Sequence, residues 1–340
     1  MIMKQSNTIY SYFIISHFNS MVAPEAFTID ATFANDVKVG LSDTPKRLSS
    51  KYFYDKKGDA LFQQIMAMPE YYPTDCEFEI FSTYKEQLRG ELGGQPFQLI
   101  ELGAGDGMKT KVLLKHFLAK DSDFSYAPID ISGNVLEQLE SDLAVLWPEL
   151  PVQTVAAEYF KGLEQLSEND ERKLVLFLGG NIGNMQSDEA RSFLKQLANR
   201  LNPGDLILIG FDLQKDPEIV LEAYNDSTGI TAQFNLNLLD RINEELGGDF
   251  DVNCFRHWAT YDPITGETES YLISTCAQEV YIESLGQTFQ FRAWEAVHTE
   301  LSLKYNLPQI SNLAAASGFQ VKKNYMDDRN YFVDSLWEVK

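Results

Sequence analysis

Cysteine and histidine are both scarce in this chain. The three cysteines, Cys76, Cys254 and Cys276, lie far apart and form no C-x-x-C pair. The four histidines show no metal-ligand spacing. These absences argue against a disulfide scaffold and against a zinc site, and they fit a reducing compartment. We therefore expect a cytoplasmic protein that holds no metal.

Positive charge and long apolar runs are also lacking. The 340 residues include 50 Asp and Glu but 28 Lys and Arg, which gives a net charge of -22. Such a surface repels phosphate backbones and anionic membranes, so we expect neither a nucleic-acid nor a membrane partner. The apolar run at residues 9–18 is shorter than the ~20 residues that span a bilayer. We expect residues 1–22 to be a disordered extension, with Met21 as an alternative start.

What the chain does contain is a glycine turn between a predicted strand and a predicted helix. Residues 98–102 are apolar and bounded by turn signals, which indicates a buried strand. Gly103, Gly105 and Gly107 follow, and the apolar stripe over 112–118 predicts a helix. This order is typical of the first unit of a doubly wound sheet, whose ligand lies at the carboxyl end of the strand. The alternative is a turn that serves only strand–helix packing.

The spacing of the turn is G-x-G-x-G, whereas dinucleotide folds have G-x-G-x-x-G. Glycines let a bulky ligand approach the backbone, and Glu101 offers a carboxylate to a cationic ligand group. The pattern resembles motif I of class I S-adenosylmethionine (SAM) methyltransferases. The spacing, together with a closing hairpin predicted from strands at 319–325 and 331–339, argues against a nicotinamide dehydrogenase.

Two of the next predicted strands end in carboxylates. The strand at 126–131 contains Asp130 near its end, where this architecture holds a ribose diol; a plain helix cap is the alternative. The strand at 152–156 leads to Glu158, which can accept the exocyclic amine of adenine. Two further strands are predicted at 174–178 and 206–211.

Segments on either side of this sheet have a different character. We expect Asp59 to cap one helix before the sheet, and Thr74 with Asp75 to cap a second. Four tyrosines around these helices predict either a packed lid or an aromatic wall over a ligand: Tyr52, Tyr54, Tyr71 and Tyr72. After the sheet, Asn235 is expected to begin a helix, and residues 254–297 have a strand-like pattern.

These patterns predict an α/β protein of the class I SAM methyltransferase type. Its Rossmann-like doubly wound sheet would end in an antiparallel C-terminal hairpin, and a smaller α+β unit would bind the substrate. Beyond the extension, the expected parts are N-terminal helices of the substrate unit at 23–80, a SAM-binding domain at 81–213 and 303–340, and an inserted α+β unit at 214–302.

Six ordered blocks resemble the histidine-specific, SAM-dependent methyltransferase family, which includes the L-histidine N-alpha-methyltransferase of ergothioneine biosynthesis. The longest block reads K-Y-F-Y-D-K-K-G-D-A-L-F-Q-Q-I-M-A-M-P-E-Y-Y-P-T-D-C-E. The blocks cover residues 51–77, 101–110, 128–132, 177–184, 223–237 and 299–305. Apart from the N-terminal extension, the resemblance extends over the whole chain.

The resemblance implies the positions of both ligands. It implies that SAM is held by Gly103, Lys109, Asp130 and Glu158, to which the turn adds Glu101, Gly105 and Gly107. Family members often have aspartate at position 158.

For the amino-acid substrate, the resemblance implies that Asn184 and Tyr224 bind the carboxylate and that Tyr54 is the catalytic residue near the α-amino group. Tyr71 would lie near the side chain, and Glu300 with Ser302 would bind the imidazole. An acceptor and a hydroxyl two residues apart on an extended segment share one face, so the pair can satisfy both ring nitrogens.

The implied activity is N-methylation of the α-amino group of L-histidine, continued to the trimethylated betaine hercynine. One departure concerns Ser270, an expected substrate-binding residue, where family members that act on histidine commonly have methionine. The smaller serine would open the side-chain pocket. Another amino acid, of the tryptophan type or a modified histidine, therefore remains an alternative substrate, and a non-catalytic SAM- or amino-acid-binding regulator is a second alternative. We expect a monomer that binds small molecules.

Overall fold

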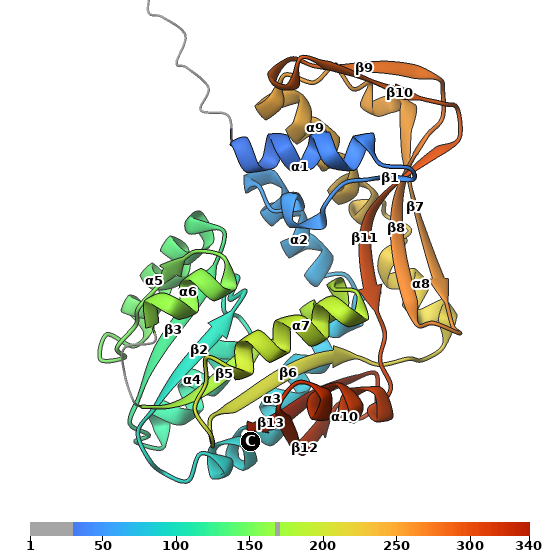
Figure 1. The fold of residues 1–340 in the computed structure, drawn as a ribbon. Helices are drawn as coiled ribbons and strands as arrows, with labels where there is room; N and C mark the ends of the chain where they lie inside the picture. The colour runs from blue at the N-terminus through green and yellow to red at the C-terminus, as the bar shows by residue number, and fades with distance from the viewer. Residues whose placement is uncertain (1–29, 167–170) are drawn as a thin grey trace, which may run out of the picture.

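The computed structural model describes residues 30–166 and 171–340. Figure 1 shows a layered α/β unit and a smaller unit, with helix α2 (Lys56–Met66) on the side of the smaller unit that faces the larger one. The prediction for residues 1–22 lies outside the described residues.

A seven-stranded sheet forms the centre of the larger unit, in the order β12-β13-β6-β5-β2-β3-β4. The five strands from β4 to β6 in this order are parallel, whereas β13 is antiparallel to both β6 and β12. The strands are β2 (Phe97–Leu102), β3 (Phe124–Asp130), β4 (Val155–Ala156), β5 (Arg172–Phe177), β6 (Leu206–Asp212), β12 (Phe319–Met326) and β13 (Phe332–Val339). The predicted fold class, with its closing hairpin, is confirmed.

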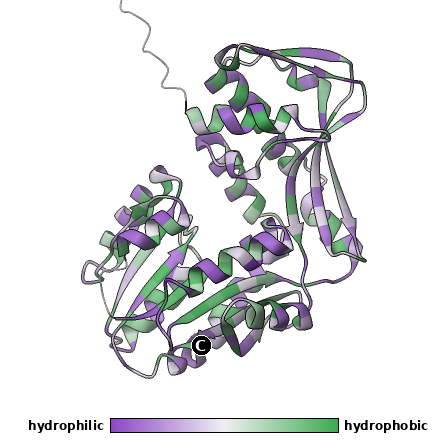
Figure 2. Cartoon of the chain, in the orientation of Figure 1, coloured by the Kyte–Doolittle hydropathy of each residue, from purple (hydrophilic) through white to green (hydrophobic). Residues whose placement is uncertain are grey.

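Helices cover both faces of this sheet (Figure 2), which is why its central strands β2 and β6 are buried along their whole length. Successive side chains of a strand point to opposite faces. Leu99 packs into the core beneath α3, α4 and α5, and Ile100 packs into the core beneath α6, α7 and α10. The helices are α3 (Tyr72–Glu91), α4 (Thr110–Ala119), α5 (Gly133–Leu146), α6 (Tyr159–Leu166), α7 (Ser187–Ala198) and α10 (Leu307–Ala316).

The smaller unit is built from two distant parts of the chain. A four-stranded sheet has the order β1-β11-β8-β7, and β9 pairs with β10 in a hairpin. Its strands are β1 (Lys46–Arg47), β7 (Phe255–Asp262), β8 (Glu267–Ser274), β9 (Gln278–Ile282), β10 (Gln287–Phe291) and β11 (Glu295–Leu303). Its helices are α1 (Ala31–Ser42), α2, α8 (Pro217–Tyr224) and α9 (Ile230–Leu246). The short 3-10 turns in the described residues are η1 (Ser50–Phe53), η2 (Asn181–Asn184), η3 (Val252–Cys254) and η4 (Glu283–Leu285).

One hydrophobic core joins these two parts. Phe53 and Ile65, from the N-terminal segment, pack in the same cluster as Phe234 and Val297. This shared core supports the predicted division of the chain, whose exact limits stay a prediction.

Three helices begin earlier than the sequence pattern indicated. Asp55, not Asp59, caps α2, because its carboxylate accepts from the Gly58 amide at 2.6 Å. Helix α3 begins at Tyr72 with no side-chain cap, so Thr74 lies inside it.

Helix α9 begins at Ile230, five residues before the predicted start. The Asp226 carboxylate accepts from the amides of Ile230, at 3.0 Å, and Thr231, at 2.8 Å. Asp226 thereby accepts from free backbone amides of the first turn of α9, although it does not directly precede the helix. A sequence pattern that expects the cap next to the first helical residue does not identify it.

The chain passes from the large unit to the insertion after β6 and returns after β11, and these two crossings pair with each other. The Tyr305 amide donates to the Asp212 carbonyl at 2.9 Å, and the Gln214 amide donates to the Tyr305 carbonyl at 2.8 Å. The pairing fixes where the end of β11 lies relative to the end of β6.

Candidate active site

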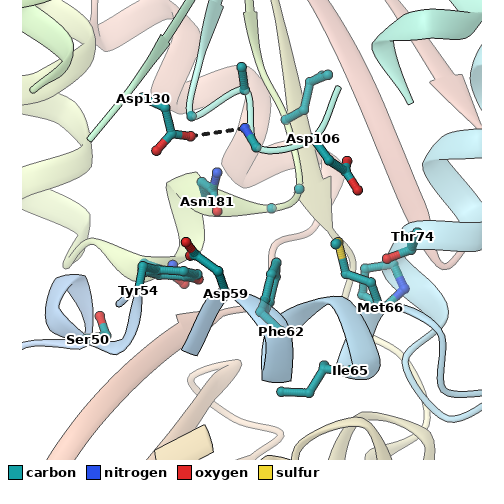
Figure 3. Close-up of a pocket in the computed structure, with 18 of the residues that line it drawn as sticks. Ser50, Tyr54, Asp59, Phe62, Ile65, Met66, Thr74, Asp106, Asp130 and Asn181 are labelled. Carbon is teal, nitrogen blue, oxygen red and sulfur yellow. Dashed lines mark hydrogen bonds between the residues drawn. The ribbon is translucent and has the colours of Figure 1, made fainter. Parts of the chain in front are cut away.

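A pocket of about 420 Å³ lies between the carboxyl ends of the parallel strands and the smaller unit. In Figure 3, Asp106 and Asp130 approach it from the loops of the large sheet, and Tyr54, Asp59 and Phe62 approach it from the opposite side. Both units therefore contribute to one cavity, as expected when a ligand binds at the carboxyl edge of a doubly wound sheet.

The glycine turn forms one wall of the pocket. Gly103, Gly105 and Gly107 have positive φ angles of 74°, 53° and 64°, a backbone conformation that glycine adopts without strain. A Cβ at Gly103 would lie 3.3 Å from the Tyr159 hydroxyl, so the absence of a side chain keeps this wall open to a ligand.

Asp130 is held against this turn. One of its carboxylate oxygens accepts from the Gly105 amide at 3.0 Å, the bond that is dashed in Figure 3. The other accepts from the Ser132 amide at 2.9 Å. Since each oxygen has a further lone pair, the carboxylate still has acceptor capacity for a diol.

Glu101 lines the pocket but is nearly fully buried. It accepts from the Thr110 hydroxyl at 2.6 Å and from the Tyr126 hydroxyl. Burial raises the pKa of Glu101 to about 7, although these hydrogen bonds oppose the shift. Its primary contacts are thus within the protein, where it ties β2 to α4 and β3.

Lys109 also lines the pocket and forms an ion pair with the buried Glu77. Although burial lowers the pKa of Lys109, the charge of Glu77 raises it above its usual value. The same Glu77 accepts from the Gly179 amide at 2.8 Å. This pair therefore connects the glycine turn to the loop after β5.

Glu158, predicted to accept the adenine amine, is not among the residues that the pocket brings together. Its side chain is exposed and lies 3.8 Å from the Lys161 ammonium. The next residue, Tyr159, does line the pocket. Asp59, Phe62 and Asn181 also line the pocket and were not predicted to do so. An aromatic residue such as Tyr159 or Phe62 in a helical pattern fits core packing as well as it fits a pocket wall, so the sequence did not distinguish the two.

Six of the seven residues predicted to contact the amino acid line the same pocket as the glycine turn. These six are Tyr54, Tyr71, Asn184, Tyr224, Glu300 and Ser302. Burial and the nearby Glu300 carboxyl hold the pKa of Tyr54 well above its usual value, so this phenol stays protonated at neutral pH.

Glu300 and Ser302 reach the pocket from one face of β11. A bulge between His298 and Glu300 shifts the register of β11 against β8. Burial raises the pKa of Glu300 to about 7, against the opposing charge of Lys304. Ser302 accepts from the Tyr224 hydroxyl at 2.8 Å.

Ser270 was predicted to bind the substrate, but it is not among the residues that line the pocket. It is fully buried on β8, directly opposite Glu300, and donates to the Glu300 carboxylate at 3.3 Å. Its effect on a ligand therefore passes through the position of Glu300.

Two absences concern the described ranges 30–166 and 171–340. No group of three or more His, Cys, Asp or Glu side chains in them is arranged to hold a metal ion. No helix there is both long enough and apolar enough to cross a membrane.

Comparisons with known proteins agree with this geometry. The model of the family described as histidine-specific, SAM-dependent methyltransferase matches residues 33–339. The histidine N-alpha-methyltransferase of Mycolicibacterium smegmatis is 34% identical over 301 residues, which cover 88% of this chain and 93% of that protein. The enzyme of the same name from Mycobacterium tuberculosis is 35% identical with the same coverage.

A third relative is longer than this chain. Ergothioneine biosynthesis protein 1 of Schizosaccharomyces pombe is 30% identical over 288 residues, which cover 82% of this chain and 37% of that protein. The family match over nearly all described residues, together with a glycine turn that leaves room for the cofactor, leads to one conclusion: this chain belongs to the histidine-specific, SAM-dependent methyltransferase family and is an N-methyltransferase that uses SAM.

Proposed function

We propose that this chain methylates the α-amino nitrogen of L-histidine and that repeated transfer yields the trimethylated product, hercynine. The observation that carries the proposal is the presence of Glu300 and Ser302 in the same pocket as the glycine turn. The Glu300 carboxylate can accept from the N–H of a neutral imidazole, and the Ser302 hydroxyl lies on the same strand two residues away. The names and the identity of the mycobacterial relatives support the same substrate.

Within this proposal, Gly103 and Gly105 leave space for SAM along the backbone, Gly107 allows the turn its left-handed conformation, and Asp130 accepts from the ribose hydroxyls of SAM. Lys109 lies where a cation can meet the carboxylate of SAM. When bound, SAM supplies a methyl group that is already activated, so the protein contributes orientation and the exclusion of water.

The substrate amine must present a neutral lone pair in line with the methyl group. In the proposed pose, Asn184 and Tyr224 bind the substrate carboxylate, and Glu300 binds the imidazole ring. These two contacts direct the amine toward the glycine turn, where SAM would bind. Tyr54, whose phenol is neutral, orients the amine through a hydrogen bond. The ring faces of Tyr54 and Tyr71 also suit an amine that gains bulk with each transfer and carries a permanent positive charge after the third.

The proposal is tested by calorimetric titration of L-histidine in the presence of S-adenosylhomocysteine. We expect Glu300→Ala to lower histidine affinity by about 10- to 100-fold, because a hydrogen bond to a charged group is lost. S-adenosylhomocysteine affinity should not change, because Glu300 lies in the other half of the pocket.

Glu300→Gln serves as the matched variant, since it keeps the shape and one acceptor oxygen and should lose less. L-tryptophan is the control ligand. Equal losses of both ligands in Glu300→Ala, or wild-type binding of tryptophan in preference to histidine, would contradict the proposed substrate.

A further inference from the structure

A fully buried lysine lies behind the substrate half of the pocket. Lys304 follows the last residue of β11, and it does not line the pocket. Its ammonium donates to the Tyr224 hydroxyl and to the Ser302 hydroxyl, each at 2.8 Å. It also lies 2.9 Å from a carboxylate oxygen of Asp212.

These three contacts occupy all the donors of the lysine. An ammonium group has three N–H donors and no acceptor. Lys304 therefore has no donor left for a ligand, and any influence on the substrate must pass through Tyr224 and Ser302, which do line the pocket.

The charge of this cluster is not balanced internally. Asp212 also forms an ion pair with Lys215, which in turn donates to the Tyr72 hydroxyl at 2.8 Å. Two ammonium groups thus share one carboxylate, and both lysines are buried. Glu300 is within electrostatic reach of Lys304 but is only partly ionised near neutral pH, because burial raises its pKa to about 7.

A buried net positive charge is unfavourable unless a ligand compensates it. The cluster lies against the pocket, because Asp212 and Tyr224 belong to its lining. An anionic ligand group at this wall would supply the missing charge.

The hydrogen bonds of the two hydroxyls lead to the same conclusion. Tyr224 and Ser302 each accept from Lys304, and one of them donates to the other. Each hydroxyl has one proton, so the pair has two protons and uses one of them internally. Whichever way the internal bond runs, the remaining hydroxyl proton is left for an acceptor in the pocket.

We propose that Lys304 is a positioning residue that makes the Tyr224–Ser302 pair a hydrogen-bond donor for the carboxylate of the substrate. This inference rests on the proposed function, in which the amino-acid carboxylate lies against Tyr224. If it is correct, Lys304 strengthens the binding of an amino acid relative to the amine that lacks the carboxylate.

The experiment compares L-histidine with histamine, which keeps the amine and the imidazole but lacks the carboxylate. Both ligands are titrated into wild type and Lys304→Met in the presence of S-adenosylhomocysteine. We expect the preference of the wild type for histidine to fall by about 10- to 100-fold in Lys304→Met. Histamine affinity should change little. A general loss of packing would instead weaken the binding of both ligands.

Lys215→Met is the matched control, since it removes a charge from the same Asp212 but no donor from Tyr224 or Ser302. Its preference for histidine should fall less than that of Lys304→Met. If Lys304→Met does not fold, as judged by S-adenosylhomocysteine binding, Lys304→Gln replaces it. This variant keeps N–H donors without the charge, and its preference for histidine over histamine should also fall.

Equal losses of histidine and histamine in the Lys304 variants, or an unchanged preference, would overturn the inference while the proposed function stands. Failure of the wild type to bind histidine at all would instead overturn the proposed function. The role of Lys304 would then be tested with tryptophan and tryptamine as the ligand pair.

Discussion

Gly107 illustrates how single residues set the shape of the cofactor wall. Its φ of +64° belongs to the left-handed region, and a Cβ there would lie 2.8 Å from a methyl carbon of Leu139. The methyl group can move, but the backbone strain of a side chain at this φ remains. The glycine is thus required by conformation more than by space.

We expect Gly107→Ala to lower the free energy of unfolding by about 1–2 kcal/mol, the cost of a left-handed conformation for an L-residue. S-adenosylhomocysteine affinity should fall with it, because the turn must shift. Gly90→Ala is the control: Gly90 lies inside α3 with no atom within 4 Å of the added Cβ, so alanine should stabilise by about 0.5–1 kcal/mol. Urea denaturation measures both, and equal effects in the two variants would contradict the role of φ.

The buried carboxyl group of Glu101 should make the free energy of unfolding depend on pH. Burial raises the pKa of Glu101 to about 7 in the folded state, whereas in an unfolded chain the same group has its ordinary pKa of 4.5. The unfolded state therefore releases this proton at lower pH, so the contribution of Glu101 to stability falls as pH rises from about 4.5 to about 7 and is constant above that range.

The free energy of unfolding of wild type should thus decline relative to Glu101→Gln by roughly 3 kcal/mol between pH 4.5 and pH 7, from 1.36 kcal/mol per pKa unit. Denaturation curves of both proteins across this range give the difference directly. A difference that stays constant, or rises with pH, would refute the assigned shift.

At the scale of elements, the turn between α8 and α9 depends on one carboxylate. Asp226 accepts from two amides at the start of α9, while Tyr224, just before it, lines the pocket. Although burial opposes it, hydrogen bonds from Thr228 and Thr231 hold the pKa of Asp226 well below its usual value. Its stabilising effect is therefore present above about pH 4 and is lost on acidification.

Asp226→Ala should cost about 1–2 kcal/mol of stability at pH 7, in the upper range for the loss of a helix cap. Asp226→Asn, which keeps one acceptor, should cost less. The check is urea denaturation at pH 7 and at low pH, where the gap between wild type and Asp226→Ala should narrow. A gap independent of pH would indicate that packing, and not the carboxylate, stabilises this turn.

For the whole molecule, the dominant electrostatic property is the net charge of -22. Like charges over the surface repel one another in the compact state, and salt screens this repulsion beyond about 10 Å at 0.1 M. We expect the melting temperature to rise when sodium chloride is increased from low concentration to 0.2 M. A fall would mean that the attractive surface pairs, such as Lys57 with Asp240, outweigh the net repulsion.

Much of the large unit was predictable, because its signals are local. Apolar runs bounded by turns indicated the parallel strands, and the glycine spacing indicated the ligand edge of β2. Since the ends of parallel strands meet at one edge, Asp130 could be placed near the glycines, where it lies. The starts of α2 and α9 were wrong because Asp55 and Asp59 are equally good caps locally, and because Asp226 acts from four residues away.

The amino-acid half of the site stays a prediction in its roles, though its residues do share one pocket. The sheet, the glycine turn and the family could be predicted from the residues alone, because they depend on periodicity, backbone conformation and ordered motifs. The exposure of Glu158 and the burial of Lys304 between Asp212 and Tyr224 are apparent in the folded molecule alone. Burial and charge pairing join residues that are distant along the chain, and no local pattern specifies such partners.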